Sequence, residues 1–166
     1  MNIQFYVEKL KESEEYKKFM KENPKAFFCS GFFVIDKEGK DFKQHFDFYV
    51  PETKKIFSFY GEDNMKLVET ERNETNIPDK IDFKFDLDFQ AVEDMVLDRM
   101  EKEKIKNNLQ KLLFSLQKSE GKLALIGTVF ISKMALLKVI IDIKKKEITQ
   151  FEKKSFFDMF KIIKTK

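Results

Sequence analysis

The most apolar stretch of the chain, residues 122–151, strongly limits the folds that are open to it. A helix that crosses a bilayer needs about 20 consecutive, mostly apolar residues, and Lys133 and Lys138 interrupt this stretch. The stretch is rich in β-branched residues, and from Leu137 to Ile143 apolar side chains recur at every second position, the period of a strand. We therefore predict buried strands rather than a membrane anchor. The predicted strands span 122–131, 136–143 and 147–151, with turns at 132–134 and 144–146.

The composition is typical of a globular protein with a core of its own. Of 166 residues, 42% are hydrophobic and 37% are charged, and the charged residues are interleaved with apolar ones, which argues against disorder. A chain of this length forms one domain or two small units in contact. We predict a single compact domain over 1–166. The one cysteine, Cys29, lies in an apolar run, so we expect a buried thiol and no intrachain disulfide.

The first part of the chain has the pattern of a helix followed by antiparallel strands. Residues 4–22 contain good helix formers without Gly or Pro, and Asn23-Pro24 ends the predicted helix. Aromatic and alternating segments follow, separated by polar turns. The predicted strands span 26–35, 42–50 and 55–60, and 65–71 is a candidate fourth strand before a polar loop at 72–79.

A second helical region is predicted in the middle of the chain. Strict alternation of apolar and polar residues predicts a half-buried strand from Ile81 to about Leu87, after which Asp88 is a suitable helix cap. Apolar side chains at helical spacing then predict helix over 90–118, either as one bent helix or as two helices divided at the polar segment 101–104.

The order of a helix followed by three strands occurs twice, which suggests internal repeats over 4–71 and 90–166. In this interpretation the first strand of one copy, 26–35, corresponds to 122–131 of the other. The matching segments are GFFVI at 31–35 with GTVFI at 127–131, and TKKIFSF at 53–59 with KKKEITQF at 144–151. Chance similarity between apolar strands is the alternative. The predicted fold class is α+β, an antiparallel sheet with helices packed on one face and two αβββ repeats that hide one sheet edge.

The segments YVPETKKIFSF and IIDIKKKEITQF resemble PepSY-type domains. In that family a helix precedes a three-stranded sheet, and an Asp-x-x-Thr-Gly-Lys-like turn joins the last two strands. Residues 142–146 and 51–54 are similar to that turn, although both lack its Gly. The resemblance implies a cystatin- or PepSY-like fold and a binding or inhibitory module, often extracytoplasmic. The order of elements also resembles type III secretion chaperones, which implies a secretion-type chaperone as an alternative.

The sequence contains no motif of a catalytic, cofactor or zinc site. It has no HExxH, CxxC, GxSxG or GxGxxG pattern, so we predict a protein that is not an enzyme and binds no cofactor. His45, the one histidine, lies on the charged side of an alternating strand, and we expect it at the surface. Asp82, Asp86 and Asp88 form the best acidic cluster, with a solvated face as the first interpretation and a divalent-metal site as the alternative.

Charge is distributed unevenly along the chain. Residues 1–100 carry 16 Lys and Arg against 22 Asp and Glu, whereas 101–166 carry 16 against 7. A last helix is predicted over 155–164, capped by Ser155 and almost entirely apolar. We predict a binding surface in this basic and aromatic C-terminal region. Its candidate residues are Lys144, Lys145, Lys146, Lys153, Lys154, Phe156, Phe157 and Phe160.

From these features we predict a non-catalytic adaptor that binds a protein or peptide through a sheet edge, the aromatic sheet face or the C-terminal helix. A nucleic-acid partner on the basic C-terminal region is the alternative, although Arg, the usual reader of bases, is nearly absent. A homodimer is a further alternative. Residues 1–18 contain no apolar signal segment, so we expect a cytoplasmic protein without membrane insertion.

Overall fold

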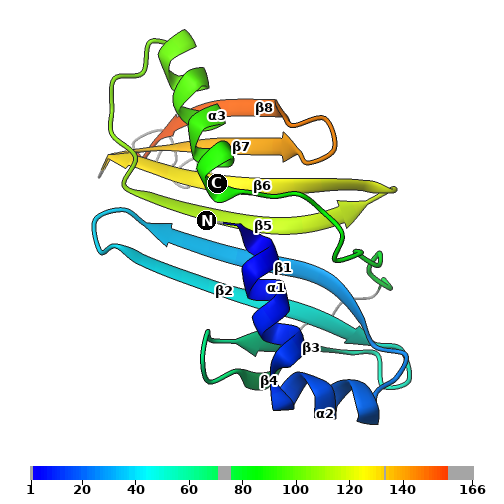
Figure 1. Cartoon of the computed structure of the whole chain (residues 1–166). Coiled ribbons are helices and arrows are strands. Elements are labelled where there is room, and N and C mark those ends of the chain that lie inside the picture. Colours follow the sequence, from blue (N-terminus) through cyan, green and yellow to red (C-terminus); the bar gives the residue numbers. More distant parts are fainter. Residues whose placement is uncertain (1, 71–75, 133, 157–166) are drawn as a thin grey trace.

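Three helices lie on one eight-stranded antiparallel sheet in the computed structural model, which describes residues 2–70, 76–132 and 134–156 (Figure 1). The helices are α1 (Ile3–Glu12), α2 (Glu14–Glu22) and α3 (Phe89–Lys102). The strands are β1 (Phe27–Asp36), β2 (Asp41–Val50), β3 (Lys55–Tyr60), β4 (Lys66–Thr70), β5 (Lys111–Ser119), β6 (Lys122–Ser132), β7 (Ala135–Asp142) and β8 (Glu147–Ser155). This architecture confirms the predicted α+β class.

The sheet consists of two four-stranded meanders that meet at their first strands. The strand order is β4-β3-β2-β1-β5-β6-β7-β8, so β1 and β5 are neighbours at the centre. They pair antiparallel, from Ser30 opposite Gln117 to Asp36 opposite Lys111. Because this pairing joins segments about 80 residues apart, the two halves of the chain share one continuous sheet.

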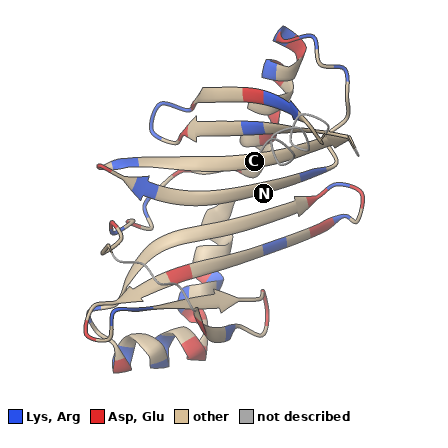
Figure 2. Cartoon of the chain, turned by 180° about the vertical axis from the view of Figure 1, so that it is seen from behind, with Lys and Arg blue, Asp and Glu red and all other residues tan. Residues whose placement is uncertain are grey.

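The helices cover the same face of the sheet, as we predicted. Figure 1 shows α1 and α3 in front of the strands, and in Figure 2, seen from behind, the strands lie in front of them. Alternate residues of the strands point toward the helices and form one large core with them. The core includes Val7 and Leu10 of α1, Val92 and Val96 of α3, and the strand residues Phe28, Phe33, Phe46, Phe48, Phe59, Leu112, Phe114, Leu116, Val129 and Val139.

Aromatic rings fill the core beneath α2. Phe19 packs edge-on against Phe59 with ring centroids 5.3 Å apart, and Tyr16 contacts Phe48 at 5.6 Å. Burial raises the pKa of the Tyr16 phenol, since the charged form loses its hydration. Edge-to-face pairs of this kind stabilise a core beyond the area that they bury.

The single helix predicted over 4–22 is divided at Ser13. This residue ends α1 and caps α2, because its hydroxyl donates to the carbonyl of Leu10 at 2.7 Å and accepts from the backbone N–H of Tyr16 at 3.2 Å. Serine followed by acidic residues is a typical helix start. The sequence therefore contained the signal for a second helix start at Ser13. The prediction missed it because the segment has no Gly or Pro.

The helix predicted over 90–118 is correct only in its first part. Residues 89–102 form α3, but 111–119 form β5, a central strand. Leu112, Phe114 and Leu116 point into the core, while the residues between them face the other side of the sheet. The leucines of this segment fit a helical stripe as well as a strand, and the pairing of β5 with β1 and β6 decides between them.

The strand predicted over 81–87 is not part of the sheet. The segment is extended but irregular, and it lies on the helix side, where Ile81 and Leu87 are buried. The amide of Ile81 donates to the carbonyl of Phe28 at 2.8 Å, and the ring of Phe83 stacks on Phe28 at 4.7 Å. The alternation therefore predicted correctly that the segment is half-buried. It was wrong in predicting a strand, because the segment has no strand partner.

The remaining predicted strands are confirmed, including the fourth strand of the first half. The stretch 122–151 forms β6, β7 and the start of β8, and none of the described helices is long and apolar enough to cross a membrane. The strand β8 continues to Ser155, the predicted cap of a last helix over 155–164, and extended backbone is typical of a helix cap. Beyond Phe156 that prediction lies outside the described residues.

The helix-and-strand pairing of the proposed repeats needs correction. Both halves contain four strands, because β4 completes the first half and 111–119 is an additional strand of the second. The alignment of 26–35 with 122–131 therefore matches the first strand of one half with the second strand of the other. By position in the sheet, β1 corresponds to β5 instead.

Candidate functional site

The face of the sheet opposite the helices, called the open face here, carries the broadest candidate site. No described helix covers it, and Figure 2 shows it with few charged residues along the middle of the central strands. Apolar side chains from β1, β5, β6 and β7 lie on this face, with Ser115 and Thr128 between some of them, and form what we call the apolar band. Its residues are Phe32, Val34, Leu113, Ile126, Phe130 and Ile140.

The apolar band is partly accessible to solvent. Ile126 is 42% exposed, and the other members are half-buried. Apolar side chains that gather on one exposed face are typical of binding surfaces. The β-sheet scaffold holds these side chains in fixed positions, since every strand that contributes to the band has a partner on both sides.

A hollow in the open face lies within the apolar band. Its volume is about 420 Å³, and Val34, Leu113 and Phe130 form its apolar lining. Charged residues of both signs complete the lining, namely Asp36, Asp41, Lys43 and Lys111. The lysines form long, exposed ion pairs with the acids, 3.5 Å for Lys43 with Asp41 and 3.9 Å for Lys111 with Asp36. Such pairs exchange partners at little cost.

A polar cluster lies on the open face beside the apolar band. Asp47 of β2 is only 1% exposed, and its carboxylate accepts hydrogen bonds from the hydroxyls of Ser30, at 2.6 Å, and Ser58. The Oγ of Ser58 also lies 2.9 Å from the Oγ1 of Thr70. These contacts connect β1, β2, β3 and β4 through side chains, which satisfies a carboxylate that would otherwise be costly to bury.

His45 differs from the surface residue that we expected. Its side chain is 19% exposed, its ring stacks on Phe32 with centroids 5.2 Å apart, and Tyr60 lies 4.9 Å away on the other side. Its Nε2 is 3.7 Å from Oδ1 of Asp47. The hydroxyl of Ser58 is directed to Asp47, so the described atoms do not form a serine–histidine–aspartate relay. Cys29 is buried, as predicted.

The predicted C-terminal surface is divided in the structure. Lys144, Lys145 and Lys146 form the β7–β8 turn, and Lys153 and Lys154 lie on the edge strand β8. Ion pairs partly neutralise this group, namely Lys145 with Glu147, Lys146 with Asp86 and Lys154 with Glu152. Phe156 is half-buried, whereas Phe157 and Phe160 lie outside the described residues.

The acidic cluster predicted as a possible metal site does not assemble. Asp88 caps α3 by accepting from the backbone N–H of Gln90 at 3.1 Å, and Asp86 pairs with Lys146 at 3.1 Å. Asp82 is exposed. Among residues 2–70, 76–132 and 134–156, no group of three or more metal-ligating side chains is close enough to hold an ion.

Sequence reasoning missed most of the apolar band. The aromatic sheet face was among the predicted surfaces, but Leu113 was assigned to a helix and Phe130 only to the core. Their place on the open face depends on the pairing of β5 with β1 and of β6 with β5. A period of two within 111–119 was the one local signal that could have located Leu113.

The chain matches no protein-family model and no curated protein. Among solved structures, its fold is similar to that of a putative lipoprotein from Clostridium difficile 630, with a TM-score of 0.55. The sequences are 12% identical, and the match covers 85% of this chain and 91% of that chain. At this level of identity the likeness concerns the fold alone.

Proposed function

We propose that the protein is a non-catalytic binding module that holds a protein partner against the open face of its sheet. The observation that supports this most is the apolar band, a rigid apolar surface that no described helix covers. Protein interfaces combine an apolar centre with a polar rim. The acids and lysines around the hollow provide charges of both signs at such a rim, so we expect a partner with an apolar centre and a mixed-charge border.

A nucleic-acid partner has less support. Nucleic-acid surfaces need an excess of positive charge, and acids beside three of the predicted lysines offset the charge of this region. On the open face, Phe130 shares the lining of the hollow with acids as well as lysines. A secretion-type chaperone is a special case of the proposed binding role. The nature of the partner would distinguish it from other protein-binding modules.

The PepSY-type resemblance, the duplication and the cytoplasmic location stay predictions. The structural neighbour is named as a lipoprotein and carries no PepSY label. A location outside the cytoplasm is therefore the competing proposal to the one made from the sequence. Fractionation of native cells, with the protein followed by antibody, separates the two.

The proposal predicts that a charge in the apolar band prevents partner binding without unfolding the protein. Ile126→Glu places a carboxylate in the band, and Leu97→Glu on α3 is a matched control because both side chains are 42% exposed. Partners are first captured from native lysate, and the affinity of each variant for them is then measured. We expect Ile126→Glu to weaken binding at least about tenfold, as at an interface hot spot, and Leu97→Glu to leave it unchanged.

Two further measurements make this test decisive. Thermal unfolding of both variants checks that the fold is retained, since exposed substitutions change stability by no more than about 0.5 kcal/mol. Nuclease treatment and a salt series identify any partner that is held by nucleic acid. Equal binding by Ile126→Glu and the wild type, with both folded, would contradict the proposal.

A further inference from the structure

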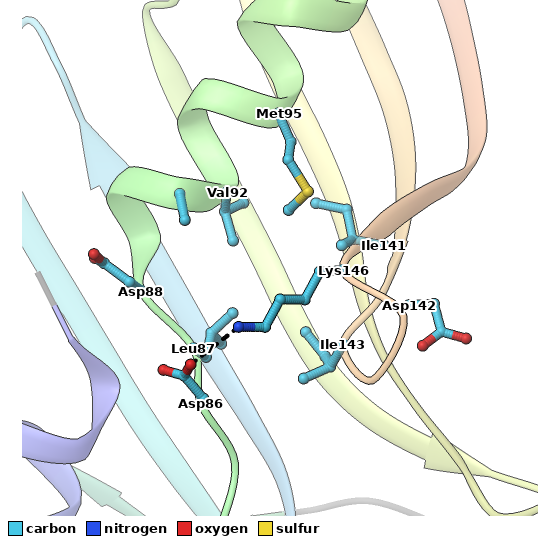
Figure 3. Close-up of a pocket in the computed structure, with 10 residues that line it drawn as sticks. Asp86, Leu87, Asp88, Val92, Met95, Ile141, Asp142, Ile143 and Lys146 are labelled. Carbon is cyan, nitrogen blue, oxygen red and sulfur yellow. Dashed lines mark hydrogen bonds and ion pairs between the residues drawn. The ribbon is translucent and has the colours of Figure 1, made fainter.

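A cavity on the helix side of the sheet is independent of the open face. It has a volume of about 280 Å³ and lies between the first turns of α3, the residues that precede α3 and the end of β7 (Figure 3). Leu87, Val92, Ile141 and Ile143 are buried residues of its lining, and Met95 closes it from the helix. These walls are aliphatic, so the interior suits an aliphatic group rather than a polar one.

The helix arrangement explains why this space is open. In the first half of the chain two helices, α1 and α2, cover the sheet, and Phe19 of α2 fills the gap over β2 and β3. In the second half α3 is the one described helix that lies over β5–β8. Its C-terminal part reaches β8, where Arg99 lies over the ring of Phe151 at 5.3 Å. Beside its N-terminal part the cavity remains.

One ion pair spans the mouth of the cavity. The Nζ of Lys146, in the β7–β8 turn, lies 3.1 Å from the carboxylate of Asp86, and Figure 3 shows the lysine side chain reaching across the entrance. Both side chains are well exposed, so the pair stabilises the fold little and opens at little cost. Two other acids near the mouth are already engaged, because Asp88 accepts from Gln90 and Asp142 from the amide of Lys145.

We propose that this cavity binds a free aliphatic amino acid of the leucine, isoleucine or methionine type. Entry of a ligand separates Lys146 from Asp86 and leaves one charge of each sign at the mouth. A zwitterion restores both ion pairs, with its carboxylate on Lys146 and its ammonium on Asp86, while its side chain contacts the aliphatic walls. A ligand with a single charged group satisfies only one of them.

The size of the cavity agrees with this class of ligand. Its volume of about 280 Å³ gives room for an aliphatic side chain of this kind, with the two charged groups of the ligand at the mouth. Burial of the aliphatic side chain supplies the affinity.

The test is a titration of the full chain, labelled at isoleucine methyl groups, followed by NMR. L-Leucine is compared with 4-methylpentanoate, which lacks the ammonium, and with 3-methylbutylamine, which lacks the carboxylate. We expect saturable shifts at Ile141 and Ile143 and none at Ile126 on the open face. Each ligand with a single charged group should bind at least about threefold more weakly than leucine, the loss of one exposed ion pair.

Variants assign each charge of the ligand to its partner. Lys146→Met keeps the aliphatic stem and should weaken the binding of leucine and 4-methylpentanoate but not that of 3-methylbutylamine. Asp86→Asn should weaken the binding of leucine and 3-methylbutylamine but not that of 4-methylpentanoate. Lys145→Met is the matched control, since Lys145 and Lys146 are 67% and 66% exposed and only Lys146 reaches Asp86. Thermal unfolding of each variant shows that it is folded.

Several results would overturn the assignment. The absence of saturable shifts at Ile141 and Ile143 with leucine, isoleucine and methionine would remove the site. Equal binding of leucine and either ligand with a single charged group would show that the site does not recognise a zwitterion. None of these results depends on the partner of the open face, because the two sites lie on opposite sides of the sheet.

Discussion

Gly127 of β6 lies directly opposite Phe114 of β5, and its missing side chain makes room for the phenylalanine ring. A Cβ atom at position 127 would lie 2.4 Å from Cε1 of that ring and 2.7 Å from Cδ1. Distances this short require the ring or the strands to move in a core that is packed as densely as an organic crystal. At the residue scale, the close approach of β5 and β6 therefore depends on this glycine.

We predict that Gly127→Ala destabilises the protein by about 1–3 kcal/mol through overpacking. Urea unfolding measures the change. Gly127→Ala should cost less stability in a Phe114→Leu background than in the wild type, because the smaller side chain leaves space for the new methyl group. Wild-type stability of Gly127→Ala would show that the ring does not occupy the space beside the glycine.

At the scale of elements, alternation and turn residues predicted seven of the eight strands, since these signals are local to each hairpin. The strand β5 was not predicted, because the leucines at 112, 113 and 116 satisfy helical and strand periods alike. The strand predicted over 81–87 was wrong for the opposite reason. Its alternation is clear, but the segment has no strand partner. Only pairing across the chain separates these cases, and one sequence does not contain that information.

The placement of β5 makes a prediction of its own. A strand with partners on both sides donates all its amides, whereas an edge strand leaves alternate amides without a strand partner. Native-state hydrogen exchange should therefore show uniformly slow amides from Leu112 to Leu116, near the limit set by global unfolding. In β8 slow and faster amides should alternate. Fast exchange throughout 111–119 would contradict a central strand there.

At the scale of the whole molecule, contacts between distant parts of the chain create both candidate sites. The pairing of β1 with β5 brings Val34 beside Leu113 on the open face, and α3, packed over the second half of the sheet, forms the cavity with the end of β7. The sequence predicted the fold class and helices on one face, and it named the aromatic sheet face as one possible surface. It could not place the apolar band or the cavity, because each is built from strands and helices that are distant in the chain.

The most direct test of the central claim, that the open face binds a protein partner, is photo-crosslinking in native cells. A photoreactive amino acid replaces Ile126 on the open face or Leu97 on α3, two side chains of equal exposure. The account predicts that position 126 crosslinks to one defined partner protein, that position 97 does not, and that a charge introduced at Phe130 abolishes the crosslink. Equal crosslinking from both positions, or a defined partner from position 97 alone, would contradict it.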